Sequence, residues 1–344
     1  MELTTGENDS GRRLDRILRK ALKGHPLSLI HRLLRKGQVF VNGKRAKPQD
    51  RVESGVIISI PSLKSPVSNK PELSEKNNKP LSDAEYLVKN PSFSRAAPWN
   101  PKLKNTPNNS SMTPIWQDSG LIAFNKPAGL AVHGSDSLDT IVRSFLADKL
   151  PPSLSFTPGP LHRLDKPSSG IVVFSTSLEG AQFFTSLMKN HKIKKTYLAI
   201  VEGTINKNEI WEDNLIRDHE KKKSFIYDSS YSACGDISRA KTALTKITPL
   251  SSNNGYTLIQ AEIVTGRTHQ IRAQAGAHGH PLLGDIKYNE RLTVNREQRR
   301  KRNNYIANFY LHAWKLEFSD HKIEAPLPEA FKKKMIEFFG KEII

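Results

Sequence analysis

The segment from Ser62 to Thr113 constrains the fold more than any other part of this 344-residue chain. It is rich in Pro, Asn, Ser and Lys and lacks sustained hydrophobic periodicity. Its prolines are Pro66, Pro71, Pro80, Pro91, Pro98, Pro101 and Pro107. Because proline is excluded from helix interiors and central strands, neither element can run through this segment. We therefore expect a flexible linker over residues 62–113, between a small domain at 1–61 and a larger one at 114–344.

The charge balance indicates a polyanionic partner. The chain contains 53 Lys and Arg against 34 Asp and Glu, a formal net charge of +19, and residues 1–61 hold 13 basic against 6 acidic groups. Nucleic acid is the partner we expect from this excess. The lone Cys234 excludes an internal disulfide and a Cys-cluster zinc site, and the absence of a long apolar run predicts no membrane span. A cytoplasmic protein is therefore expected.

Residues 1–61 predict two amphipathic helices and a small sheet. Apolar spacing predicts a helix over 12–23 and a second one N-capped by Ser28 and ended by Gly37, while Asn42-Gly43 predicts a hairpin turn after a strand at 39–41, with a returning strand at 56–60. A solvated exterior is the ordinary explanation for the cations on these helices. Only Asp15 and Asp50 offset them, however, which favours an RNA-binding surface. Its candidate residues are Arg12, Arg16, Arg19, Lys20, Arg32, Arg35, Lys36 and Lys44.

Short motifs in this first domain resemble a known RNA-binding module. They are Arg13-Leu14-Asp15, Leu22-Lys23-Gly24, Arg35-Lys36-Gly37, Val41-Asn42-Gly43-Lys44 and Lys47-Pro48. This pattern is similar to the RNA-binding domain first seen in ribosomal protein four of the small subunit. The resemblance implies a small α/β domain that binds RNA.

From Pro114 onward, short apolar runs separated by turns predict a different architecture. Strands are predicted at 121–124, 171–174, 197–201, 257–264 and 309–318, and helices at 140–150, 178–190, 269–278 and 328–339. Strands dominate and the helices do not alternate strictly with them. The predicted class is therefore α+β with a mainly antiparallel, mixed sheet.

The segment 161–170 contains several residues of types that can take part in catalysis. His162, Arg163 and Asp165 lie within four residues, directly before the predicted strand at 171–174. An ordinary connector holding an Asp–Arg ion pair is the alternative explanation. The segment 266–272 favours a functional site over an ordinary connector. Its Arg267 and Arg272 supply cations at a predicted helix start, where a buried carboxylate could find its charge partner.

Six ordered segments in this domain resemble the RluA-type pseudouridine synthases. They are Asn125–Gly129 with Val132-His133, His162–Gly170, Lys195–Ala199, Gly266–Arg272, Gly279–Pro281 with Gly284-Asp285, and Leu311–Ala313. The resemblance implies an isomerase that converts uridine to pseudouridine in RNA without a cofactor. Combined with the first domain, it is closest to family members that act on large-subunit (23S) ribosomal RNA. The sequence also lacks a dinucleotide fingerprint, and His278 and His280 alone do not make a metal site.

The resemblance assigns the roles at the site. Asp165 is implied as the essential carboxylate, which attacks the sugar or removes a sugar proton to give a glycal; the sequence does not separate these routes. Either role needs an ionised group, so an adjacent cation must hold the charge, with Arg272 as the candidate and Arg267 as the alternative. Tyr197 aligns with the family's active-site tyrosine, and a half-buried strand aromatic is the alternative explanation.

The substrate-binding residues follow from base flipping. A uridine inside a stacked helix cannot react, so it must be extruded, and Arg163 matches the family residue that fills the gap. His162 is expected to shape the loop, and Lys126 to support the floor of the site. Pro167 departs from the family pattern, because it replaces an Asp and removes a backbone donor. The basic run at 291–302 is a further candidate for phosphate contact, with an exposed helix as the alternative.

Other functions stay open at this point. The chain could be a non-catalytic RNA-binding or ribosome-assembly factor, or a pseudouridine synthase acting on tRNA. A hydrolase using His162 and Asp165 is weakly supported, because their spacing on a turn does not establish a nucleophile–base geometry. The expected partner is RNA, either large-subunit rRNA or a ribosome assembly intermediate, with no membrane, and the chain is expected to be a monomer.

Overall fold

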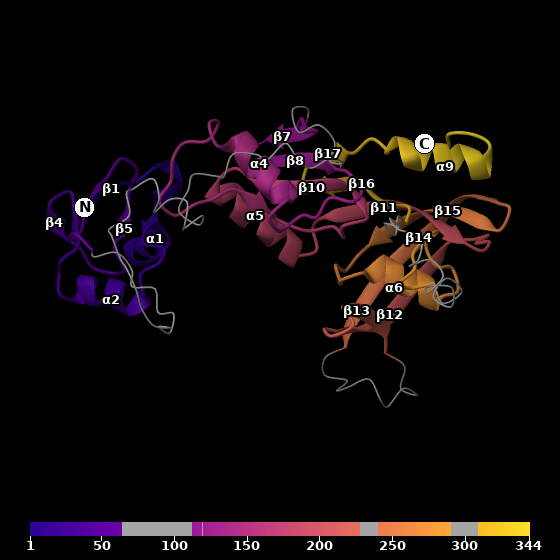
Figure 1. Ribbon diagram of the computed structural model, residues 1–344, viewed down its shortest axis with the longest axis horizontal. Coiled ribbons are helices and arrows are strands. Elements are labelled where there is room, and N and C mark those ends of the chain that lie inside the picture. The colour runs from indigo at the N-terminus through magenta and orange to yellow at the C-terminus, as the bar shows by residue number, and fades with distance from the viewer. Residues whose placement is uncertain (64–111, 119, 228–239, 290–308) are drawn as a thin grey trace, which may run out of the picture. The chain divides into compact units, whose positions relative to one another are not determined.

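The computed structural model describes residues 1–63, 112–118, 120–227, 240–289 and 309–344 (Figure 1). Nearly all of the predicted linker, Cys234 and the basic run at 291–302 lie outside these residues. The chain divides into two compact units, one made of Met1–Asn109 with Ser144–Thr157 and the other of Ser110–Arg143 with Pro158–Ile344. We refer to the first as the N-terminal unit and to the second, which holds the motifs expected to be catalytic, as the catalytic unit. No helix of the described residues is long and apolar enough to cross a membrane.

The N-terminal unit packs two helices against short strands. One sheet has the order β1-β6-β3-β4, and β2 pairs separately with β5. The elements are β1 (Glu2–Thr4), the 3-10 helix η1 (Glu7–Asp9), β2 (Arg12–Arg13), α1 (Leu14–Ala21), α2 (Leu27–Arg35), β3 (Phe40–Val41), β4 (Lys44–Arg45), β5 (Arg51–Val52) and β6 (Ile57–Ser59). The inward faces of both helices form the core that the apolar spacing predicts, with Leu14, Ile17, Leu18, Ile30, Leu33 and Leu34 buried.

Details of this unit differ from the prediction. The first helix begins at Leu14 rather than residue 12, because Arg12 and Arg13 are extended and pair with β5. The second helix has Pro26, not Ser28, as its N-cap, since proline needs no intrahelical partner at a helix start. The Asn42-Gly43 turn is present, with φ of 47° and 75°, but it joins β3 to β4, and β6 pairs with the other edge of β3.

A segment remote in sequence completes the N-terminal unit. Leu154 packs against the core of this unit, and the backbone of Gly6 approaches Pro152 so closely that a Cβ on Gly6 would lie 2.0 Å from the Pro152 oxygen. Asp9 is fully buried and accepts hydrogen bonds from the Leu154 and Ser155 amides at 2.8 and 2.9 Å. Residues 144–157, which sequence reasoning grouped with the larger domain, therefore pack with the smaller unit.

The catalytic unit is built on one large sheet. Its strand order is β13-β12-β14-β15-β11-β16-β10-β8-β7, with β17 beside β16 and β9 beside β10. All neighbouring pairs are antiparallel except β10 with β16, so the α+β class with a mainly antiparallel mixed sheet is confirmed. The strands are β7 (Trp116–Asp118), β8 (Leu121–Lys126), β9 (Gly159–Pro160), β10 (Ser169–Ser175), β11 (Lys194–Glu202), β12 (Glu209–Asp218), β13 (Lys223–Ile226), β14 (Lys241–Asn253), β15 (Tyr256–Ile263), β16 (Leu311–Phe318) and β17 (His321–Glu324).

The helices of this unit begin close to where periodicity predicts them. They are α4 (Leu138–Leu146), whose last residues belong to the other unit, α5 (Leu178–Lys189), α6 (Gln270–Ala277) and α9 (Glu329–Phe339). Ser177 caps α5 by accepting a hydrogen bond from the Gly180 amide at 3.0 Å. Every residue of β10 is buried, so the loop that precedes it is anchored to the most protected strand of the sheet.

Candidate active site

The loop before β10 is fixed by glycine packing and backbone hydrogen bonds. Gly170 has a φ of +113° and lies against β16, where a Cβ would come within 2.3 Å of the Ala313 oxygen, so only glycine fits here. The Ser168 amide donates to the backbone carbonyl oxygen of Asp165 at 3.1 Å and closes a turn. Pro167 lies inside this turn, whose hydrogen bond does not require the N–H that proline lacks. The loop therefore presents Asp165 from a rigid support.

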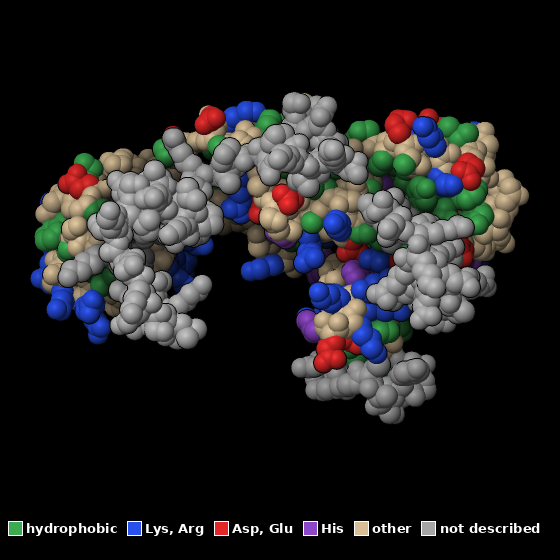
Figure 2. Space-filling view, in the orientation of Figure 1, with side chains coloured by type: hydrophobic (Ala, Val, Ile, Leu, Met, Phe, Trp, Pro, Cys, Tyr) green, Lys and Arg blue, Asp and Glu red, His purple; other side chains and the backbone are tan. Residues whose placement is uncertain are grey.

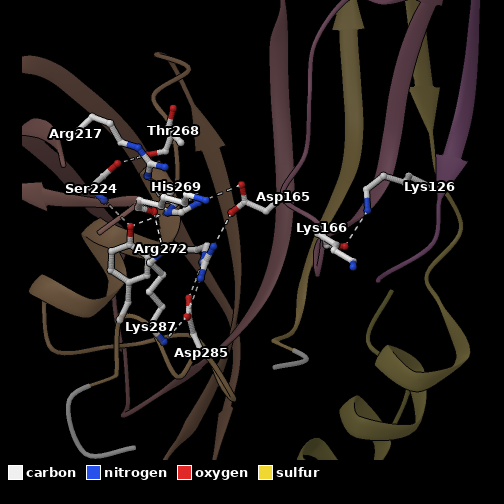
Figure 3. Close-up of polar contacts among 12 residues, drawn as sticks. Lys126, Asp165, Lys166, Arg217, Ser224, Thr268, His269, Arg272, Asp285 and Lys287 are labelled. Carbon is white, nitrogen blue, oxygen red and sulfur yellow. Dashed lines mark hydrogen bonds and ion pairs between the residues drawn. The ribbon is translucent and has the colours of Figure 1, made fainter. Parts of the chain in front are cut away.

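Asp165 is paired with Arg272, the cation expected from sequence (Figure 3). Arg272 Nη1 donates to Asp165 Oδ2 at 2.8 Å, while its Nε and Nη2 donate to the two oxygens of Asp285 at 2.7 and 2.9 Å. Burial alone would lower the Arg272 pKa, but the hydrogen bonds and charge of Asp285, and then of Asp165, raise that pKa overall. A permanently charged guanidinium therefore lies against one oxygen of the Asp165 carboxylate. Arg267 instead donates its Nε to the Thr242 oxygen at 2.9 Å.

The pair opens onto a cavity of about 300 Å³, within the size range of small-molecule sites. Asp165, Tyr197 and Arg272 all line it, as do Arg163 and Arg267. Figure 2 shows Lys and Arg side chains gathered around the hollow of the catalytic unit. The structure thus brings the three proposed catalytic residues together from the loop, β11 and α6.

Tyr197 lies on β11 and is half-buried against the core of the sheet. Burial raises the pKa of its phenol, and the nearby charge of Asp165 raises it further. The phenol is therefore protonated at neutral pH. Its position in the cavity wall makes it more than a packing aromatic, because part of the side chain stays open to a ligand.

The remaining predicted substrate-binding residues separate into two groups. Arg163 is exposed at the cavity and forms no hydrogen bond or ion pair within the described parts of the chain, so its guanidinium is available to RNA. His162 instead accepts a hydrogen bond from the Val173 amide at 3.1 Å and stacks on Phe184. Burial lowers the His162 pKa to about 3, which keeps the ring neutral and supports the loop-shaping role.

Lys126 is fully buried and is not part of the cavity wall. Its Nζ donates to the backbone oxygens of Pro127, Leu130 and Lys166 at 3.0, 2.8 and 3.2 Å, and burial lowers its pKa to about 7. Figure 3 shows the bond to Lys166, the neighbour of Asp165. Lys126 therefore supports the loop that carries Asp165 from behind and does not line the cavity.

Sequence reasoning assigned no role to Lys195, which also lines the cavity. Burial lowers the Lys195 pKa, and its Nζ lies 3.7 Å from where a Cβ on Gly266 would stand. No hydrogen bond or ion pair joins Lys195 to another described residue. The signal was available, because residues two apart on a strand share a face and Lys195 precedes Tyr197 by two.

The residues considered for a metal are engaged elsewhere. His278 Nε2 contacts Asp213 Oδ2 at 3.1 Å, and His280 Nδ1 contacts the backbone oxygen of Glu202 at 3.1 Å. Over the described ranges, no group of three or more His, Cys, Asp or Glu side chains is arranged to hold a metal ion.

Seven of the eight predicted RNA-binding residues are exposed on the N-terminal unit. They are Arg16, Arg19, Lys20, Arg32, Arg35, Lys36 and Lys44. Figure 2 shows Lys and Arg side chains gathered around α2. None of the seven has a carboxylate partner among the residues that the structure describes, which leaves their charge available to phosphate. Arg12 differs, because its Nη1 donates to the Ser155 hydroxyl at 2.7 Å within the unit.

Comparison with known proteins places this fold and site in a family. Residues 120–277 match the family model for RNA pseudouridylate synthase, and residues 12–58 match the S4 domain. The chain belongs to the pseudouridine synthase family and is an isomerase of that class.

Named relatives cover almost the full length. Ribosomal large subunit pseudouridine synthase C of Haemophilus influenzae is 30% identical over 322 residues, 93% of this chain and 87% of that protein. The protein of the same name from Escherichia coli (strain K12) is 28% identical over 332 residues, 95% of this chain and 92% of that protein. The structure titled Human RNA Pseudouridylate Synthase Domain Containing 4 shares the fold, with a TM-score of 0.52 at 22% identity, covering 64% of this chain and 91% of that chain.

Proposed function

We propose that this enzyme converts specific uridines of large-subunit (23S) ribosomal RNA to pseudouridine, with Asp165 as the catalytic carboxylate. The observation that carries the proposal is the single hydrogen bond from Arg272 to Asp165 Oδ2, which leaves Oδ1 free of hydrogen bonds in the described part of the chain, in a residue that lines the cavity. The substrate assignment is supported by the relatives named as large-subunit enzymes and by the S4 domain.

The reaction breaks the bond between uracil N1 and ribose C1′ and forms a bond between uracil C5 and C1′. Asp165 Oδ1 can attack C1′ directly, or it can remove a ribose proton to give a glycal, and in both routes Arg272 holds the other oxygen of the carboxylate. In the direct route the Asp165–C1′ bond breaks as C5 joins C1′, and in the glycal route the removed ribose proton returns to the sugar. C5 then loses a proton and N1 gains one, so the product is an isomer of the substrate. No electron is gained or lost, and the reaction needs no oxidant or reductant.

The neighbouring side chains take supporting roles in this proposal. The protonated Tyr197 offers its ring face for stacking on uracil, because its raised pKa makes the phenol a poor base. Arg163, which has no partner among the described residues, fills the gap left by the extruded base. The exposed cations of α1 and α2 bind RNA phosphates and deliver the substrate. We take the working form to be a cytoplasmic monomer that acts on rRNA or on a ribosome assembly intermediate.

Mapping pseudouridine in cellular RNA tests this proposal. We expect specific large-subunit positions to lose pseudouridine in cells lacking the protein, and to regain it with the wild type but not with Asp165→Asn. Loss confined to tRNA would show that the substrate assignment is wrong. An unchanged map would support a non-catalytic RNA-binding or assembly factor instead, although the open Asp165–Arg272 site favours catalysis.

A further inference from the structure

Arg272 alone does not fix the orientation of Asp165. Two of its donors, Nε and Nη2, are taken by Asp285, so the bond that reaches Asp165 comes from Nη1 alone. A carboxylate held at one oxygen by one bond can still turn about its Cβ–Cγ axis. Presenting Oδ1 in a defined direction therefore needs a second contact.

His269 lies at the other oxygen of the same carboxylate (Figure 3). Its Nε2 is 3.6 Å from Asp165 Oδ1, and its side chain is 13% exposed. The residue precedes α6 with a φ of 55° and ψ of 26°, the left-handed region that non-glycine residues rarely adopt. Strained conformations of this kind are held by the surrounding structure and concentrate at functional sites.

The partners of Nδ1 define the tautomer of His269. Nδ1 lies 2.8 Å from the Tyr288 hydroxyl and 3.5 Å from Arg217 Nη1, and a guanidinium can only donate. The Tyr288 oxygen already accepts a hydrogen bond from the Ser224 amide at 2.8 Å, so its own proton is available for Nδ1. Nδ1 is therefore the acceptor, and the ring proton lies on Nε2, which is directed at Asp165.

The charge state of the ring agrees with this assignment. Burial lowers the His269 pKa to about 4, and the charges of Arg272, Arg217 and Lys287 add to that effect while Asp165 opposes it. The ring is therefore neutral at physiological pH. It can donate through Nε2 without transferring its proton to Asp165.

We propose that His269 is a positioning residue that, locked in its Nε2–H tautomer by Tyr288, orients Oδ1 of Asp165 toward the reacting nucleotide. At 3.6 Å the contact is longer than a hydrogen bond, and it shortens when a nucleotide fills the cavity, as catalytic hydrogen bonds commonly do. Asp165 then has one oxygen held by Arg272 and the other aligned by His269. This inference rests on the proposed pseudouridine synthase activity.

Matched substitutions at His269 test the inference. His269→Phe keeps an aromatic ring but has no N–H, whereas the side-chain amide nitrogen of His269→Gln lies the same number of bonds from Cβ as Nε2. We expect the Phe variant to lower the single-turnover rate by about 10- to 100-fold, while RNA affinity changes by less than about threefold. The Gln variant should recover most of this rate. A Phe variant with the wild-type rate, or a Gln variant no better than Phe in a folded protein, would overturn the inference.

Tyr288→Phe tests the tautomer separately. Long-range ¹H–¹⁵N NMR of the wild-type protein should report a protonated Nε2 and an unprotonated Nδ1 in His269. Tyr288→Phe should show both tautomers of His269, and its single-turnover rate should fall by about threefold to tenfold. Tyr256→Phe, on a ring stacked on Phe338 in another cluster, is the matched control and should keep the wild-type rate. A protonated Nδ1 in the wild type would overturn the inference that Tyr288 holds His269 in its Nε2–H tautomer. If the wild type makes no pseudouridine at all, the proposed function fails, while the NMR result still decides the tautomer.

Discussion

The two units each contain an aspartate with several polar contacts, and the two sites differ in what they leave open. Asp9 in the N-terminal unit has no exposed surface, and both of its oxygens accept hydrogen bonds from amides and hydroxyls. Asp165 in the catalytic unit has a side chain that is 19% exposed and accepts one bond from a cation at one oxygen. A carboxylate whose lone pairs are all satisfied can only hold structure, whereas one with a free oxygen at a cavity can react.

The donors at the two sites also differ in charge. Neutral amides and hydroxyls surround Asp9 and lower its pKa against the effect of burial, which would raise it. Asp165 faces Arg272, whose position is set by a second carboxylate, Asp285. The first arrangement ties residues 153–155 to the rest of the N-terminal unit, and the second places a carboxylate at the cavity. The difference predicts that substitutions at the two sites affect stability and activity in opposite proportions.

The largest expected effect separates the two aspartates by activity. Asp165→Asn keeps the size of the side chain but removes the negative charge, so we expect turnover of an rRNA fragment to fall by about 10³-fold or more. Asp9→Asn should leave turnover of a short stem-loop substrate near the wild-type value. Single-turnover assays at saturating enzyme measure both. Equal losses in the two variants would remove the distinction between the sites.

The next largest effect tests the role of Asp285, the carboxylate that holds Arg272. Asp285→Asn removes the charged partner of Nε and Nη2 of the buried Arg272, and we expect a loss of about 3 kcal/mol in the free energy of unfolding. The rate should also fall by about 10²-fold, because Arg272 can then move away from Asp165. Urea unfolding and turnover measure the two losses.

A more exposed ion pair supplies the control for that experiment. Asp139, whose side chain is 17% exposed against 1% for Asp285, accepts from Arg143 one helical turn away and lies 3.9 Å from the exposed His133. Asp139→Asn should therefore cost less than about 1 kcal/mol and leave the rate unchanged. A similar loss in the free energy of unfolding for both variants would mean that the burial of the Asp285–Arg272 pair does not increase its contribution to stability.

Asp9 should affect stability and not turnover. We expect Asp9→Asn to destabilise the N-terminal unit by about 2 kcal/mol, because the side-chain amide cannot accept from all of the donors around it. The folded-state pKa of Asp9 is lowered, so its contribution is complete above about pH 4 and is lost as the pH falls through the folded-state pKa. Hydrogen exchange of the α1 amides in both proteins should therefore converge at low pH. A difference that does not shrink as the pH falls below about 4 would contradict this linkage.

The contrast also explains what the sequence could and could not predict. Contiguous patterns predicted β10, α5 and the loop with Asp165, because each depends on neighbours in sequence. The hydrogen bonds of Asp9 with Ser155 and of Tyr288 with His269 depend on residues that only the tertiary fold brings together. No local pattern records such pairs. The sequence pattern offered both Arg267 and Arg272 as cations for the carboxylate, and the resemblance to a known family favoured Arg272.

Two long strands were also missed, for local reasons. The strand β14 contains Pro249, which argues against a central strand, yet the register shifts between Pro249 and Ser251 and the bulge accommodates the proline. The strand β12 carries four acidic residues and exposes Ile210 while burying Trp211, so its apolar pattern is weak. Sheet pairing on both edges stabilises each strand where its own sequence does not.

The smallest expected effect concerns the exposed cations of the N-terminal unit, which unlike Arg272 have no carboxylate partner in the described part of the chain. Replacing Arg16, Arg19 and Lys20 with Gln should weaken RNA binding about tenfold near physiological salt. The slope of log K against log salt should fall by about 0.7 to 0.9 for each phosphate that the variant no longer neutralises. Arg12→Gln is the informative comparison, because Arg12 is engaged with Ser155 and its removal should change the salt slope less. An unchanged slope in the triple variant would show that the α1 cations do not contact RNA phosphates. The α2 cations would then be the remaining candidates for the RNA-binding surface.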